Sequence, residues 1–150
     1  DEFPNVFIMR TFSKAYGLAN YRVGYMMSSV ELANYIQTIR LPYNLNTLSQ
    51  VAAEAAFEDQ EFLRATVRKN AVERDLWEQT LDEVKATYYK SGANFIFMSV
   101  PNADGLADAW LAKGYQVRRG QRDNWLRVTL PTASDGAIMR SILKDYMARQ

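Results

Sequence analysis

A long tract of helical pattern, at about residues 46–84, separates two segments that favour β-strands. The pair Glu58 and Asp59 is expected to break or bend this tract, with Asp59 capping its second part. In that second part apolar residues recur at helical spacing, at Leu63, Val67, Ala71, Trp77, Leu81 and Val84. The charged residues between them are expected to face water: Arg64, Arg68, Lys69, Glu73 and Glu78. Because such a stripe is usually core, we expect a long packed helix in an α/β chain.

The segment before the tract predicts two strands and a short helix. The apolar run V-F-I-M at residues 6–9 indicates a buried strand, and residues 22–27 indicate a second, partly buried one. A helix over residues 29–40 is expected next, because Ser28 and Ser29 supply a cap and Ser28 with Glu31 forms a capping-box pattern. The chain should therefore begin with a strand, a loop, a strand and a helix.

The segment after the tract predicts a compact α+β unit. Its strongest strand signal is N-F-I-F-M-S-V at residues 94–100. A helix over residues 103–113 should stop at Gly114. Strands over residues 115–119 and 125–130 should flank a polar turn at 120–124, before a last helix over 134–149. That helix is expected to present four apolar side chains to the sheet: Ile138, Ile142, Leu143 and Tyr146.

Composition narrows the chemistry that the chain can perform. The net charge is +1, from 18 basic and 17 acidic residues, which argues against a general role on nucleic acids or membrane surfaces. There is no cysteine and no histidine, so thiolate catalysis is excluded and we expect no metal site. A lysine is then the leading candidate for acid–base chemistry near neutral pH. The lack of cysteine fits a reducing cytoplasm.

The loop after the first strand, T-F-S-K-A-Y-G-L-A-N-Y-R-V-G, suits an aldehyde cofactor that carries a phosphate. Lys14 would form a Schiff base with the aldehyde. The planar fork of Arg22 would bind the phosphate, and the hydroxyls of Thr11 and Ser13 would donate to the same oxygens. Taken singly, a serine–lysine pair is usually a solvated loop end, and a lone arginine is more often at the surface or ion-paired. The whole pattern favours the cofactor site.

Residues 13–25, S-K-A-Y-G-L-A-x-x-R-x-G-Y, resemble the lysine motif of the fold-type I pyridoxal-phosphate-dependent aminotransferases, with the histidinol-phosphate aminotransferases as the most similar group. Asn20 stands where that family usually has a glycine, and we expect a positive φ there, which asparagine tolerates. The resemblance covers the whole chain and corresponds to the C-terminal portion of such an enzyme. It implies that residues 1–45 are the tail end of the large domain, with two strands of its sheet. Residues 46–150 would be the linking long helix and the small C-terminal α+β domain.

A second cluster of interest contains two arginines near the end of the chain. Arg127 lies within an otherwise apolar strand pattern, and an arginine there is costly to bury unless it meets an anion. The resemblance places Arg127 on the anionic group of the substrate and Arg118 near a substrate phosphate. On pattern alone, Arg127 could equally face outward from its strand. Arg118 could belong to an exposed basic turn with Arg119 and Arg122.

The resemblance implies transamination between histidinol phosphate and 2-oxoglutarate in histidine biosynthesis, with pyridoxal phosphate as cofactor, in a cytoplasmic homodimer. Two alternatives stay open. One is another fold-type I enzyme, either a different aminotransferase or an amino-acid-phosphate decarboxylase. The other is a non-catalytic chain whose unpaired strand edges serve for association. In the family, further groups on the cofactor ring come from a part that precedes this motif, so we expect the 150-residue chain alone to have little activity.

Overall fold

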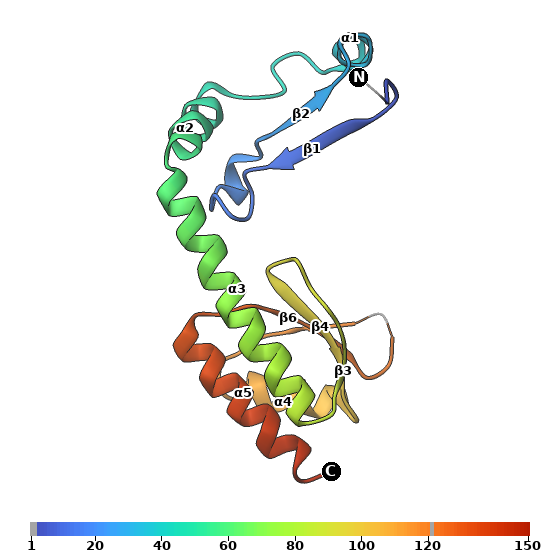
Figure 1. Cartoon of the computed structure of the whole chain (residues 1–150), viewed down its shortest axis with the longest axis vertical. Helices are drawn as coiled ribbons and strands as arrows, with labels where there is room; N and C mark the ends of the chain where they lie inside the picture. Colours follow the sequence, from blue (N-terminus) through green and yellow to red (C-terminus); the bar gives the residue numbers. More distant parts are fainter. Residues whose placement is uncertain (1–2, 121) are drawn as a thin grey trace. The chain divides into compact units, whose positions relative to one another are not determined.

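The computed structural model describes residues 3–120 and 122–150, and the chain divides into two compact units, Asp1–Val67 and Arg68–Gln150. Figure 1 labels most of the helices and strands of the two units. The first unit contains β1 (Phe7–Thr11), the 3-10 turn η1 (Ala19–Tyr21), β2 (Gly24–Ser28), α1 (Val30–Ile39), α2 (Thr47–Glu58) and the start of α3 (Gln60–Glu83). The second unit contains the rest of α3, β3 (Thr87–Tyr89), β4 (Phe95–Ser99), α4 (Ala103–Leu111), β5 (Arg118–Arg119), β6 (Trp125–Thr129) and α5 (Ala133–Met147). The expected division at residues 45 and 46 concerns the domains of whole enzymes and stays a prediction.

In the first unit, β1 and β2 form an antiparallel ribbon in which Thr11 pairs with Gly24. Both predicted strands are confirmed, but the predicted burial of the first is wrong. Every residue of β1 is exposed, and Phe7 and Met9 are 46% and 69% accessible. An unbroken apolar run is typical of a strand covered on both faces. Within the described residues β1 gains a partner strand but no covering layer.

The helix caps of the first unit follow from short polar side chains. Ser29 is the N-cap of α1, and its hydroxyl accepts a hydrogen bond from the backbone N–H of Leu32 at 3.3 Å. The cap predicted at Ser28 and Ser29 is confirmed at Ser29, but the capping box predicted for Ser28 is wrong, because Ser28 is still the last residue of β2. Asp59 separates α2 from α3 as predicted, and its carboxylate accepts from the N–H of Phe62 at 2.9 Å.

The second unit is built on a four-stranded antiparallel sheet with the strand order β3-β4-β6-β5. β4 and β6 were predicted with their ends correct to within one residue. The short edge strand β3 was not predicted, and β5 is two residues long instead of the expected five. The predicted turn at 120–124 includes residue 121, which lies outside the described residues.

One face of this sheet packs against α3, α4 and α5 to form the core. Alternation puts Ile96, Met98, Leu126 and Val128 on that face, and all four are completely buried. The helices contribute further buried side chains, namely Trp77, Leu81, Leu106, Ala107, Trp110, Met139 and Leu143. The residues that alternate with these in β4 and β6 lie on the opposite face of the sheet.

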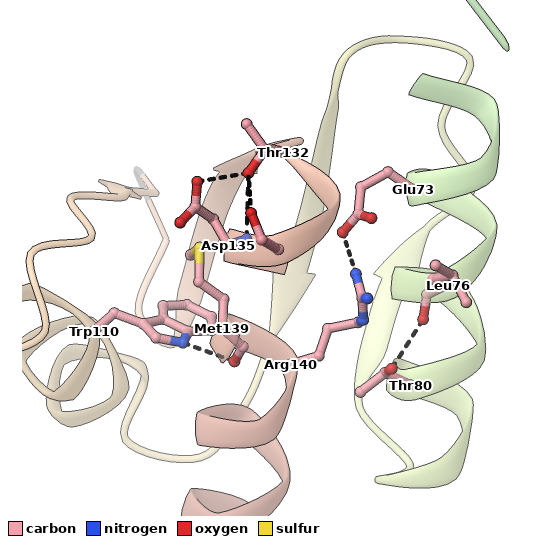
Figure 2. A network of polar contacts seen from close by, with 9 residues as sticks. Glu73, Leu76, Thr80, Trp110, Thr132, Asp135, Met139 and Arg140 are labelled. Atoms are coloured by element: carbon pink, nitrogen blue, oxygen red, sulfur yellow. Dashed lines mark hydrogen bonds and ion pairs between the residues drawn. The ribbon is translucent and has the colours of Figure 1, made fainter. Parts of the chain in front are cut away.

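Two predictions about helix faces in the second unit are wrong. Glu73 was expected to face water, yet it is buried and forms an ion pair with Arg140 of α5 (Figure 2). Ile138 was expected on the sheet, but it is exposed, and Met139 is buried in its place. Figure 2 also shows the indole N–H of Trp110, which donates to the backbone carbonyl of Met139 at 3.0 Å. That bond fixes which face of α5 is turned toward α4.

Candidate active site

Lys14 lies in a loop whose two ends are joined by the small core of the first unit. The N–H of Phe12 donates to the carbonyl of Val23 at 3.1 Å, and both side chains are buried. Lys14 follows Phe12 by two residues, and Arg22 directly precedes Val23; both are exposed. The loop therefore holds the backbones of the predicted lysine and arginine at the same end of the β1–β2 ribbon.

The conformation of this loop depends on two residues with a left-handed backbone. Gly17 has φ of 74° and donates its N–H to the carbonyl of Lys14 at 2.9 Å. Arg22 has φ of 51°, which costs a non-glycine residue about 1 kcal/mol and is often found at functional sites. The positive φ expected at Asn20 is wrong, since Asn20 lies in the 3-10 turn η1 and is not among the residues with positive φ. The strain lies instead at the predicted phosphate ligand.

The polar groups of the loop retain the donors that a phosphate needs. The hydroxyl oxygen of Thr11 accepts from the N–H of Ser13 at 3.0 Å, so its own proton is available. Arg22 donates one N–H to the carbonyl of Ala19 at 2.8 Å and keeps its other donors. Within the described residues, neither the hydroxyl of Ser13 nor the amine of Lys14 has a hydrogen bond or an ion pair. This donor set fits pyridoxal phosphate.

The second predicted cluster lies on the open face of the sheet in the second unit. Arg118 of β5 and Arg127 of β6 are directly opposite each other in the antiparallel pair. Neither has an acidic partner within the described residues. The guanidinium carbon of Arg127 lies 5.0 Å from the ring centre of Phe95, and its Nε atom is buried without a hydrogen-bond partner. Like charges that face each other across strands are destabilising, which points to an anion as the missing partner.

Arg119, which follows Arg118 in β5, binds to helix α4 instead. It forms ion pairs with Asp104 and Asp108 of α4, the second at 2.7 Å. The hydrogen bond that it donates to Asp104 and, with a smaller effect, the one that it donates to Asp108 raise the pKa of Arg119. Because neighbouring strand residues point to opposite faces, Arg118 remains on the side of Arg127. This separation favours the site role predicted for Arg118 over the exposed basic turn.

Sequence reasoning missed three aromatic residues on the same open face. Tyr89, Phe97 and Trp125 come from β3, β4 and β6, and their rings are nearly parallel. Phe97 is directly opposite Arg127 in the pairing of β4 with β6. The signal that could have identified Phe97 and Trp125 is their alternation with the buried residues of the same strands. Tyr89 had no such signal, because its strand was not expected.

Neither a metal centre nor a membrane segment is found in the described parts of the chain. No group of three or more carboxylates there could hold a metal ion. No helix over residues 3–120 and 122–150 combines the length and apolarity needed to cross a membrane.

Comparison with known proteins agrees with these features. A histidinol-phosphate aminotransferase of Lactiplantibacillus plantarum is 50% identical over 147 residues, which are 98% of this chain and 41% of the relative. One from Limosilactobacillus fermentum is 50% identical over 148 residues, 99% of this chain and 41% of the relative. The chain thus spans about two fifths of the length of these curated relatives.

Solved structures show the same fold. The histidinol-phosphate aminotransferase of Sinorhizobium meliloti, in complex with pyridoxal-5'-phosphate, superposes with a TM-score of 0.81 at 26% identity, over 97% of this chain and 42% of that chain. A putative histidinol-phosphate aminotransferase of Erwinia carotovora gives 0.81 at 26% identity, over 96% and 44%. The fold is the C-terminal part of a fold-type I aminotransferase, as predicted. The family model for aminotransferases of class I and II matches residues 1–142, so the chain belongs to that family.

Proposed function

We propose that this chain is part of a pyridoxal-phosphate-dependent aminotransferase that transfers an amino group between histidinol phosphate and 2-oxoglutarate. The reaction would serve histidine biosynthesis, in a cytoplasmic homodimer. Family membership supports the reaction class, and the names of the relatives support the substrate. The observation that carries the proposal is the cross-strand pair of Arg118 and Arg127, two guanidinium groups with no acidic partner in the described chain.

The Lys14 loop, which we call the cofactor end, would bind the cofactor. When bound, pyridoxal phosphate supplies an electron sink for the bonds at the substrate's amino carbon. Lys14 would hold the cofactor through its amine and, once displaced by the incoming amino group, would carry a proton to and from the substrate carbon. Arg22 would bind the phosphate with the donors that it does not use on Ala19. Thr11 and Ser13 would add hydroxyl donors to the same oxygens.

The arginine pair, which we call the substrate end, would bind the substrate. Arg127 would bind the carboxylate of glutamate in one half-reaction and the phosphate of the phosphorylated substrate in the other. Arg118, directly opposite, would contribute a second guanidinium to the doubly charged phosphate. An anion between the two side chains would also remove their mutual repulsion. Substrate binding and the local stability of β5 and β6 should therefore be coupled.

A labelling experiment tests the cofactor end. The purified chain is mixed with pyridoxal phosphate, reduced with borohydride and digested, and the modified lysine is identified by mass spectrometry. We expect the label at Lys14, and a lower yield at limiting cofactor in Arg22→Gln. Lys85→Arg, which removes an exposed lysine of the second unit, should leave the yield unchanged. A label spread evenly over the exposed lysines, and unaffected by Lys14→Arg, would contradict the assignment.

A titration tests the substrate end. Histidinol phosphate is added to the chain, and binding is followed by calorimetry. Arg127→Gln removes a charged hydrogen-bond donor and should weaken binding about 10-fold or more. Arg149→Gln is the matched control, because Arg149 is an exposed arginine of the second unit that does not line the cavities beside Arg118 and Arg127. Equal affinities for the wild type and Arg127→Gln would refute the role of the pair.

A further inference from the structure

The open face of the sheet in the second unit carries a cluster of three nearly parallel rings. The ring centres of Phe97 and Trp125 are 4.6 Å apart at an angle of 27°. Those of Tyr89 and Trp125 are 5.3 Å apart at 22°, and those of Tyr89 and Phe97 are 6.1 Å apart at 8°. We call Tyr89, Phe97 and Trp125 the ring cluster. The planes of the three rings are therefore nearly parallel.

The ring cluster is not part of the hydrophobic core. The core side chains of the same strands, such as Ile96 and Leu126, point to the other face and are completely buried. Tyr89, by contrast, is 58% accessible, and Phe97 and Trp125 are only half-buried. Stacking between strands stabilises the sheet. Part of the aromatic surface of the cluster, above all that of Tyr89, stays accessible to a ligand.

Two rings of the cluster, Tyr89 and Phe97, share one cavity with the arginine pair. Tyr89 and Phe97 line a cavity of about 490 Å³ together with Arg118, Arg119, Gly120, Arg122 and Arg127. This volume lies within the usual range for sites that bind small molecules, roughly 300–1,000 Å³. Aromatic faces and unpaired guanidinium groups thus meet in one space. A ligand that satisfies both must carry a flat ring and an anionic group.

We infer that the ring cluster determines the specificity of the substrate end: Tyr89 and Phe97 would stack on a planar ring of a phosphate monoester whose phosphate is bound by Arg118 and Arg127. This inference rests on the proposed function, because it uses the same arginine pair. It adds residues that the Lys14 motif and the arginines do not specify. Trp125 would act as a positioning residue, since it stacks on both of the other rings.

A pair of matched phosphate esters separates ring recognition from phosphate recognition. Phenyl phosphate and cyclohexyl phosphate have the same charge and similar size, but only the first carries a flat aromatic ring. Each is titrated into the full 150-residue chain labelled with ¹⁵N, and the indole N–H signal of Trp125 is followed, with Trp125→Phe used to identify it. Aromatic stacking should favour phenyl phosphate about 2- to 12-fold. The indole signals of the buried Trp77 and Trp110 should not move.

Substitutions then assign the preference to the cluster. Tyr89→Leu and Phe97→Leu should each reduce the preference for phenyl phosphate while cyclohexyl phosphate still binds. Tyr89 lies at an exposed edge, so its variant tests the inference even if Phe97→Leu fails to fold. Arg127→Gln should weaken both esters equally. Equal binding of the two esters, with dependence on Arg127, would overturn the ring inference alone. No binding of either ester would overturn it together with the substrate end of the proposed function.

Discussion

Glu73→Gln should strongly destabilise the second unit, although it only replaces one carboxylate oxygen by an amide NH₂ group. The side chains of Glu73 and Arg140 are 6% and 11% accessible, so the ion pair between α3 and α5 is buried. The amide keeps the shape of the carboxylate but leaves the guanidinium of Arg140 without a countercharge. Breaking a buried pair in this way costs about 3–5 kcal/mol. We expect about 3 kcal/mol, because the amide oxygen can still accept a hydrogen bond and the ring of Trp77 lies 6.0 Å from the guanidinium carbon.

The free energy of unfolding can be measured in urea by tryptophan fluorescence. All three tryptophans belong to the second unit, so the signal reports on that unit. Glu83→Gln is the matched control, because Glu83 and Lys144 also join α3 to α5 but are 59% and 49% accessible. That substitution should cost less than about 1 kcal/mol. Equal losses in the two variants would refute the reasoning that burial sets the cost.

The double variant Glu73→Leu with Arg140→Met separates the charge from the packing. A buried pair replaced by apolar side chains of similar volume is often as stable as the original. We therefore expect the double variant to recover most of the loss seen in Glu73→Gln. A double variant as unstable as the single one would show that shape, and not an uncompensated charge, causes the loss.

Three further predictions follow from other contacts of the described chain. Gly136→Ala would place a Cβ atom against the Glu73 carboxylate, so it should destabilise the second unit by about 1–3 kcal/mol in the same urea assay. Asp59→Ala removes the cap of α3 and should cost about 1 kcal/mol, seen as faster hydrogen exchange at the amide of Phe62. Burial raises the pKa of Tyr88 above its ordinary value near 10, and the hydrogen bond to Asp82 adds to this shift. The protonated hydroxyl of Tyr88 therefore stabilises the fold fully below about pH 10, and this contribution is lost as the pH rises through the raised pKa. Tyr88→Phe should therefore lose less stability than the wild type above pH 10.

Local patterns in the sequence predicted the elements whose causes are local. The break at Asp59 follows from a side chain that caps the residue three positions later. The strands β4 and β6 follow from alternation that one segment contains by itself. The role of Arg127 in binding an anion stays a prediction, which its buried Nε atom without a hydrogen-bond partner supports.

The wrong predictions concern residues whose environment is set by distant segments. Glu73 occupies a helix position that looks solvated until Arg140, 67 residues later, is brought against it. The ring cluster requires three strands to be aligned in register, and one of them is only three residues long. Single segments cannot reveal such partners, since the pairing exists only in the folded unit.

The bare ribbon of β1 and β2 has a practical consequence for anyone who handles this polypeptide. The apolar side chains of β1 are exposed to solvent on both faces. The outer edges of a two-stranded ribbon also offer unpaired N–H and C=O groups to further strands. A net charge of +1 provides almost no repulsion between molecules. The protein should therefore aggregate in concentrated solution, and charged substitutions such as Met9→Lys should keep it soluble.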